Sequence, residues 1–158
     1  MGESGRKWWT LFRGVATAKL DAKARITIAG KYRPGFAENS VFLTVDPSRC
    51  LLLYPKQHWL DIEAKLLALP SLESRARSLQ RLLLGHAEEV EIDAQNRILI
   101  SEPLRNFAGL EHDVVLVGQG KKIELWQTQR WQAEIETGIL ATQMSGASLP
   151  TFLGDLNL

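Results

Sequence analysis

The sequence has one cysteine and no long apolar run, and these two absences exclude several classes of protein. Cys50 alone cannot form an intramolecular disulfide framework or an all-cysteine metal site, and its place in the apolar run 50–54 is typical of a small buried side chain. Residues 1–9 lack the apolar core of a signal peptide, and no stretch approaches the ~18 apolar residues that cross a bilayer. We therefore expect a cytoplasmic protein with no membrane partner.

The chain also lacks the residue spacings of catalytic and metal sites. His86 has no second histidine four residues away, and His58 and His112 have no ligand at a useful spacing, so we expect no metal. The run 118–122 (Gly-Gln-Gly-Lys-Lys) precedes a strand-like segment instead of a helix, which favours a hairpin turn over a phosphate loop. Cys50 has no base at a meaningful spacing. We expect no cofactor, no small-molecule substrate and no catalysis. An enzyme of a related barrel topology is the rival interpretation, and the missing catalytic residues argue against it.

The net charge of the whole chain is small, but its sign differs between an early and a late segment. The net charge is only +1, yet residues 1–40 carry eight bases against three acids, and residues 84–136 carry five bases against ten acids. Any phosphate-facing surface should therefore come mainly from the first half.

The chain is long enough to fold around a core. Its 158 residues, 45% of them apolar, suffice to bury a core as one domain or two small packed ones.

An internal repeat is the strongest signal in the sequence. An offset of 72 aligns residues 20–60 with residues 92–132 without a gap, with ten identities in 41 positions. The identical pairs are Asp21/Asp93, Ala22/Ala94, Arg25/Arg97, Ile26/Ile98, Ile28/Ile100, Arg33/Arg105, Val45/Val117, Leu53/Leu125, Gln57/Gln129 and Trp59/Trp131. Because the identities cluster at turns and at alternating apolar positions, they indicate a duplication.

Each copy predicts the same elements. A polar Asp-x-x-x-Arg turn precedes a half-buried strand marked by alternating isoleucines, and a short helical segment follows. In the second copy Pro103 suits the first helical turn and Gly109 can end the helix. A hairpin completes each copy, with strands 41–45 and 50–54 around the turn 46–49, and strands 114–117 and 123–126 around the turn 118–121.

Two amphipathic helices should connect the copies. Apolar spacing predicts a helix from Trp59 that Pro70 ends, and another from Leu72 that Gly85 caps. Their polar faces are either solvated surface or subunit contacts. Because Trp59 and Trp131 recur at the same repeat position, we expect both in the core. After residue 132 the chain should continue as a helix and end in a mobile Gly/Ser-rich tail.

The Asp-x-x-x-Arg pairs are the candidate site. Structurally, the aspartate would cap a turn and the arginine would pair with it or with a neighbouring subunit. Functionally, the guanidinium group of an arginine can bond the O6 and N7 atoms of guanine. Lysine and arginine side chains at alternate positions would project from one face of an extended segment toward phosphates. The bases around Asp21 are Lys19, Lys23, Arg25, Lys31 and Arg33. The sequence leaves both interpretations open.

In several motifs the chain resembles the MraZ family of bacterial regulators, which are built from two SpoVT/AbrB-type units. The resemblance covers about residues 11–132. The motifs are Leu11-Phe-Arg-Gly14, Leu20-Asp-Ala-Lys-Ala-Arg25, Arg81-Leu-Leu-Leu-Gly-His-Ala87, Ile92-Asp-Ala-Gln-Asn-Arg97, Ala108-Gly-Leu110, Val115-Leu-Val-Gly118 and Glu124-Leu-Trp126.

This resemblance implies an α+β, mainly β fold, in which two tandem units form a pseudo-twofold swapped-hairpin or double-psi-like barrel. The expected divisions are a first unit at 11–58, a helical connector at 59–88, a second unit at 89–132, and a C-terminal helix and tail at 133–158. It also implies a homo-oligomeric ring that binds short direct repeats of double-stranded DNA in the promoter of its own division and cell-wall gene cluster, on the nucleoid. The residues expected at the DNA are Arg25, Lys23, Asp21, Arg97, Lys19, Arg13 and Asp93.

Three departures from the family pattern bear on the site. Ala24 and Asn96 stand where the family has glycine, in a turn that suits a left-handed backbone; alanine would carry a cost of roughly 1 kcal/mol, so the first loop should be shifted. Ala29 and Ser101 replace the proline after the isoleucine, which leaves the start of each short helix open. Acidic residues around the second loop (Glu88, Glu89, Glu91, Glu102) suggest that Arg97 is structural while Arg25 contacts DNA.

A protein-interaction or antitoxin-like module is the alternative. It would use the helical connector and the paired tryptophans Trp59 and Trp131, and it would have no DNA target of its own.

Overall fold

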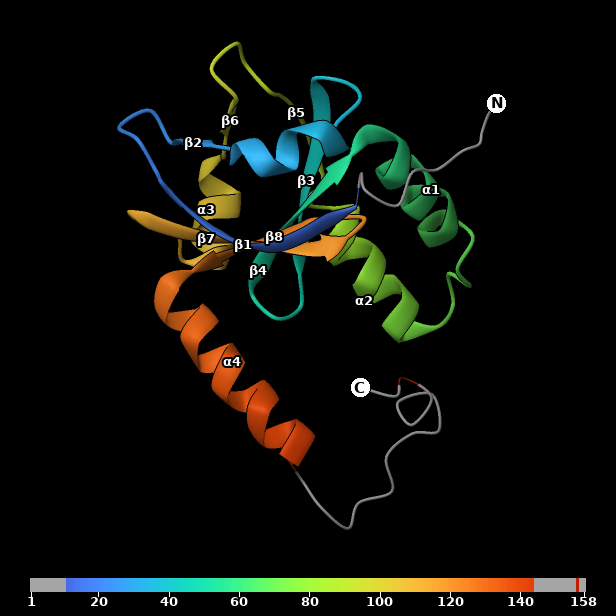
Figure 1. Cartoon of the computed structure of the whole chain (residues 1–158). Coiled ribbons are helices and arrows are strands. Elements are labelled where there is room, and N and C mark those ends of the chain that lie inside the picture. Colours follow the sequence, from blue (N-terminus) through green and yellow to red (C-terminus); the bar gives the residue numbers. More distant parts are fainter. Residues whose placement is uncertain (1–10, 144–155, 157–158) are drawn as a thin grey trace. The chain divides into compact units, whose positions relative to one another are not determined.

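The protein alternates short strands with short helices and is α+β, mainly β, as predicted (Figure 1). The computed structural model describes residues 11–143 and Leu156. The strands are β1 (Phe12–Lys19), β2 (Arg25–Thr27), β3 (Ser40–Asp46), β4 (Cys50–Pro55), β5 (Glu88–Glu91), β6 (Arg97–Leu99), β7 (Asp113–Gly120) and β8 (Ile123–Gln127). The helices are the 3-10 helix η2 (Gly30–Gly35), α1 (Lys56–Leu67), α2 (Ser74–Leu83), α3 (Glu102–Ala108) and α4 (Thr128–Gln143).

The duplication is visible in the order of the elements. Strands β2 and β6 begin 72 residues apart, at Arg25 and Arg97, and each is followed by a short helix, a hairpin and a longer helix. Helix α3 starts with Pro103 in its first turn and ends at Gly109, which has a left-handed backbone with φ 67°, as predicted. The equivalent first-copy segment is a 3-10 helix that contains Pro34. Proline removes an N–H donor and so favours this short form.

The two copies exchange their first strands. The six-stranded sheet has the order β1-β7-β8-β4-β3-β5, so β1 pairs with the hairpin of the second copy and β5 pairs with the hairpin of the first. Strands β8 and β4 join the two halves at the centre. The sheet order is therefore symmetric about the β8–β4 junction, which is the swapped arrangement expected from the resemblance. The pairings among residues 11–143 do not close into a barrel ring.

Strands β2 and β6 form a separate two-stranded antiparallel ribbon (Figure 1). The register pairs Arg25 with Leu99, Ile26 with Ile98, and Thr27 with Arg97. Ile26 and Ile98 are buried and belong to the main core cluster, while their neighbours on each strand point the other way. The ribbon thus has one face in the core and one face toward solvent.

The second hairpin is longer than predicted. Strand β7 continues through residues 118–120 because it pairs there with β1, with Arg13 opposite Gln119 and Phe12 opposite Gly120. Gly118 is required by close approach, since a Cβ at this position would lie 2.4 Å from the backbone nitrogen of Arg13. The predicted turn at 118–121 is therefore wrong in its first three residues.

Helices α1 and α2 occupy the segment between the copies. Trp59 on α1 is fully buried and stacks on Phe42 with ring centroids 5.8 Å apart, so its predicted core role is confirmed. Trp131 on α4 is only half-buried, and the core prediction for it is wrong.

Helix α4 belongs to a separate unit that starts at Gln129, and none of its described side chains is fully buried. The predicted mobile tail lies outside the described residues, apart from the exposed Leu156. No described helix combines the length and apolar character needed to cross a membrane.

Candidate nucleic-acid interface

The Asp21 carboxylate organises the first Asp-x-x-x-Arg loop. Its Oδ1 accepts hydrogen bonds from the backbone N–H groups of Lys23 and Arg25, both at 2.9 Å. Its Oδ2 accepts one from Nε of Arg25 at 3.0 Å, and the backbone closes through Asp21 N–H and the carbonyl of Arg25 at 2.9 Å. The aspartate therefore caps the turn and holds the base of the arginine side chain.

The second loop repeats this geometry almost atom for atom. Oδ1 of Asp93 accepts from the N–H groups of Gln95 and Arg97 at 2.9 and 2.8 Å. Oδ2 accepts from Nε of Arg97 at 2.9 Å, and the Asp93 N–H donates to the Arg97 carbonyl at 2.9 Å. The structural interpretation of the two pairs, a capping aspartate and its paired arginine, is confirmed.

The residue before each arginine has a left-handed backbone, as predicted. Ala24 has φ 63° and Asn96 has φ 62°, and their N–H groups donate to the carbonyls of Asp21 and Asp93 at 3.0 Å. The expected shift of the first loop is therefore wrong. The hydrogen bonds of Asp21 hold Ala24 in the same conformation that Asn96 adopts more easily.

The capping bonds also set the acidity of both carboxyl groups. Backbone donation from Arg25 is the main cause that lowers the pKa of Asp21 from its ordinary value of 3.8, and Arg97 does the same to the pKa of Asp93. Both side chains are about one third exposed, at 36% and 34%. The two aspartates therefore keep their negative charge over the whole neutral range.

The two loops are tied together by the ribbon. The Ile28 N–H donates to the carbonyl of Asn96 at 2.8 Å, and the Ile100 N–H donates to the carbonyl of Ala24 at 2.9 Å. Partners in an antiparallel pair point to the same face, so Arg25 and Arg97 stand at diagonal positions on the solvent face. Each arginine side chain is 28% exposed. One surface therefore presents both guanidinium groups.

The loops differ at their tips. Nη2 of Arg97 donates to Oε1 of Gln95 at 3.1 Å, which holds the outer part of the Arg97 fork against its own loop. In the first loop Lys23 replaces Gln95 and cannot accept such a bond. Among the described residues, none accepts from Nη1 or Nη2 of Arg25, and none forms an ion pair with the exposed side chain of Lys23. Only the first loop thus combines a fork held solely at Nε with a second cation.

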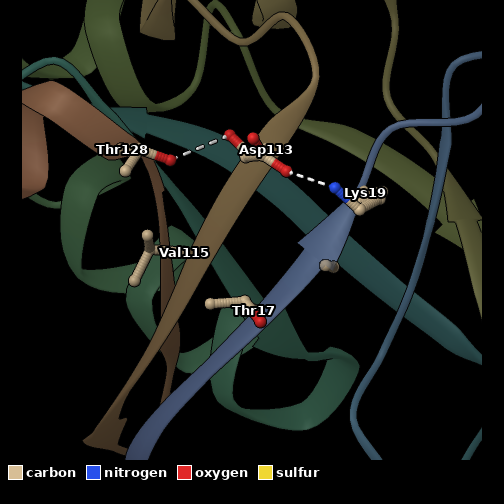
Figure 2. A pocket seen from close by; sticks show the side chains of 6 residues that line it. Thr17, Lys19, Asp113, Val115 and Thr128 are labelled. Carbon is tan, nitrogen blue, oxygen red and sulfur yellow. Dashed lines mark hydrogen bonds and ion pairs between the residues drawn. The ribbon is translucent and has the colours of Figure 1, made fainter.

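Lys19 and Arg13, the two candidate residues outside the loops, lie on β1. Lys19 Nζ forms an ion pair with Asp113 at 2.9 Å (Figure 2), and both residues line an open hollow of about 470 Å³. The lining side chains are Thr17, Ala18, Lys19, Asp113, Val115 and Thr128. The hydrogen bond from Lys19 is the main cause that lowers the pKa of Asp113. The local charge of Lys19 is therefore balanced. Arg13 is exposed on the same strand.

The first-copy bases do not share one face of an extended segment, so that prediction is wrong. The chain turns after β1, forms β2 and then enters η2. Lys31 donates through Nζ to the carbonyl of Val15 at 2.8 Å. Arg33 donates to the carbonyl of Phe36 and to Oδ1 of Asn39. Both side chains serve the fold of the first copy.

Two of the four acidic residues near the second loop, Glu88 and Glu89, have side-chain partners among the described residues. Glu89 accepts a hydrogen bond from Ser40 and forms an ion pair with Lys56 at 3.1 Å. Glu88 accepts from Ser101 at 2.7 Å. Lys56 therefore offsets the charge of Glu89, one of the four acidic residues expected to keep DNA away from the second loop. Gln95, which bonds Arg97 directly, is the clearer difference between the loops.

The sequence interpretation missed three residues on this surface. Gln95, Thr27 and Leu99 were not among the candidates, although the 72-residue offset aligns them with Lys23, Leu99 and Thr27 in the other copy. These positions differ between the two copies. Candidates chosen from residues that are identical in both copies therefore leave them out.

A family model matches the chain twice, at the spacing of the internal repeat. The family model described as "MraZ protein, putative antitoxin-like" matches residues 11–82 and again residues 83–144. The two matches begin at residues 11 and 83, which are 72 residues apart, the offset of the internal repeat. Together they include both loops and both hairpins.

Curated relatives match along nearly the whole chain. A protein of Nitrosomonas europaea named "Transcriptional regulator MraZ" is 48% identical over 151 residues, which span 94% of this chain and 100% of the relative. Proteins with the same name from Thiobacillus denitrificans and Proteus mirabilis are 44% and 45% identical, over 151 and 152 residues, with the same two coverages.

Proposed function

The chain belongs to the MraZ family of transcriptional regulators, and from that premise we propose that it regulates its own division and cell-wall gene cluster. It does so as a ring-shaped homo-oligomer that binds short direct repeats in the promoter. Double-stranded DNA and further copies of the chain are the partners in this proposal, and the nucleoid within the cytoplasm is where it acts.

The observation that carries the proposal is the state of the Arg25 side chain. Asp21 holds Nε and fixes the direction of the guanidinium group, while Nη1 and Nη2 have no acceptor among the described residues. A guanidinium held at its base and available at its tip is preorganised to donate to the O6 and N7 atoms of guanine in the major groove. Lys23, two residues away and exposed, suits a neighbouring phosphate.

The second loop supports binding in a different way. Arg97 is held at both Nε and Nη2, so a base contact would require it to leave Gln95. In this proposal Arg25 reads DNA, and Arg97 with Asp93 supports the ribbon and adds positive charge. Lys19 and Arg13 on β1 add positive charge to the surrounding field, and the contribution of Lys19 is reduced by its ion pair with Asp113.

Weak contacts of one subunit become useful through multivalency. A single loop offers one arginine fork and one lysine, which is few contacts for specific DNA binding. Joining several such sites can raise avidity by about 10² to 10⁴ if their spacing permits simultaneous binding. A ring that presents equivalent loops to successive direct repeats meets this condition.

A salt titration tests the phosphate part of the proposal. We expect binding to duplex DNA from the region upstream of the protein's own gene to weaken with salt, with a slope of about −0.9 for each neutralised phosphate. Lys23→Gln should make the slope shallower by about 0.9 for each loop that engages DNA. Lys65→Gln, which removes an exposed charge from α1, is the matched control and should leave the slope unchanged. Binding that ignores salt would contradict the proposal.

A protein-interaction or antitoxin-like module is the second candidate function. It is favoured by leucines exposed on or between the connector helices: Leu67 is 67% exposed, Leu72 91% and Leu79 37%. Exposed large apolar side chains are candidates for contacts between proteins. Co-purification of a stoichiometric protein partner, without affinity for DNA, would favour this candidate over the first.

A further inference from the structure

The hydrogen bonds of the ribbon show how its outward side chains pair. The bonds from Ile28 to Asn96 and from Ile100 to Ala24 identify these residues as hydrogen-bonded partners. Because such pairs alternate along an antiparallel ladder, the pairs Arg25–Leu99 and Thr27–Arg97 are of the non-hydrogen-bonded kind. In that kind the Cα atoms lie about 4.5 Å apart and the side chains approach more closely.

The outward face of the ribbon therefore consists of four side chains: Arg25, Thr27, Arg97 and Leu99. Both arginines recur through the duplication, but Thr27 and Leu99 occupy equivalent positions and differ in chemistry. Leu99 is 54% exposed, beside the arginine whose outer nitrogens have no described acceptor. Thr27 is exposed beside the arginine that Gln95 holds.

We propose that Leu99 is a specificity-determining residue that contacts the 5-methyl group of a thymine next to the guanine bound by Arg25. The inference rests on the proposed DNA binding. The major groove is about 12 Å wide and admits a two-stranded ribbon, and only thymine presents a methyl group there. Base pairs are stacked about 3.4 Å apart, so cross-strand neighbours on the ribbon reach adjacent base pairs.

The difference between Leu99 and Thr27 makes this reading directional. A ribbon with identical strands would present the same groups in both directions and would favour a palindrome. Here one end of the face has a purely apolar side chain, while the other end has a hydroxyl that can donate or accept a hydrogen bond. Such a face distinguishes the two directions of a DNA site, which suits direct repeats.

A selection from a randomised duplex library tests the contact. We expect the full-length protein to enrich an asymmetric motif that contains a thymine next to a guanine. Replacing that thymine by deoxyuridine removes only the methyl group and should weaken binding about fourfold. Leu99→Ser should abolish this fourfold difference while the guanine remains required, and Leu99→Val should retain most of it.

The controls separate this inference from the function on which it rests. Leu140→Ser removes another exposed leucine, outside both the ribbon and the connector helices, and should keep both the motif and the deoxyuridine effect. If Leu99→Ser binds, requires the guanine and still loses about fourfold on deoxyuridine, the role of Leu99 is overturned while DNA recognition stands. A wild-type motif without that thymine also overturns it. If wild-type protein enriches no motif at all, the proposed function fails, and this inference fails with it.

Discussion

The first and second Asp-x-x-x-Arg loops have the same backbone and the same capping carboxylate, but they differ at their tips. Asp21 and Asp93 accept matching sets of hydrogen bonds, whereas Lys23 is replaced in the second copy by a glutamine that binds Arg97. The comparison separates two roles within one motif. The aspartate and the arginine Nε build the turn, and the residue between them decides whether the arginine fork is available to a ligand.

The largest expected effect lies beneath both loops, where the copies should behave alike. Ile26→Ala and Ile98→Ala each remove a fully buried side chain from the centre of the ribbon. We expect each to lower the free energy of unfolding by about 2–5 kcal/mol, measured by urea denaturation. A loss below about 1 kcal/mol in only one of the two variants would break the symmetry assigned to the scaffold.

At the tips the copies should differ. Arg25→Ala should reduce DNA affinity by about tenfold or more, because a bidentate guanine contact is worth about 1–3 kcal/mol. Arg97→Ala should cost less, since Gln95 already holds its fork. Affinity for the promoter duplex, with subunit assembly checked by light scattering, measures the ranking. The reverse ranking in two folded, assembled variants would contradict the division of roles.

Backbone strain should distinguish the loops more weakly. Ala24→Gly should stabilise the protein by about 1 kcal/mol, because φ 63° is unfavourable for alanine and open to glycine. Asn96→Gly should change the free energy of unfolding very little, since asparagine tolerates this conformation. Equal effects of the two variants in urea denaturation would show that the loops carry equal strain.

Lowering the pH should reduce the stability that both loops contribute in the same way, and this is the smallest of the expected effects. A carboxyl group whose pKa is lowered by folding stabilises the folded state above its unfolded pKa, here 3.8, and this contribution is lost as the pH falls through the lowered folded pKa. Carboxyl carbon NMR titration should show Asp21 and Asp93 both titrating below 3.8. Asp21→Asn and Asp93→Asn should each flatten the acid side of the stability profile. A value at or above 3.8 for one aspartate would mean that its cap opens in solution.

Local features were predictable from the sequence because they depend on neighbouring residues. The first hairpin around 46–49 and the aspartate caps follow from turn chemistry and alternation within about ten residues, and the repeat follows from aligning the sequence with itself. The left-handed backbone at Ala24 was predictable on the same basis. Its normal loop geometry was not, because that depends on the strength of the hydrogen bonds from Asp21.

Long-range pairing was not predictable in the same way. The strand Phe12–Lys19 has little alternation that separates it from a loop, and its partner lies about a hundred residues away in β7. That pairing extends β7 to Gly120, which explains why the second hairpin turn was predicted too early. The roles of Lys31 and Arg33 likewise depend on carbonyl groups of distant or irregular segments, so a count of bases overstated the cationic face.

The exchange of first strands has a consequence for the order of events during synthesis. Strand β1 leaves the ribosome first, yet its partner in the sheet ends at Gly120. At a translation rate of about 5–20 residues per second, β1 waits roughly 5 to 20 seconds for that partner. For most of this interval the first hairpin also lacks β5, which begins only at Glu88. Because the copies exchange their first strands, neither half of the sheet can complete its pairing until strands of both copies have been synthesised.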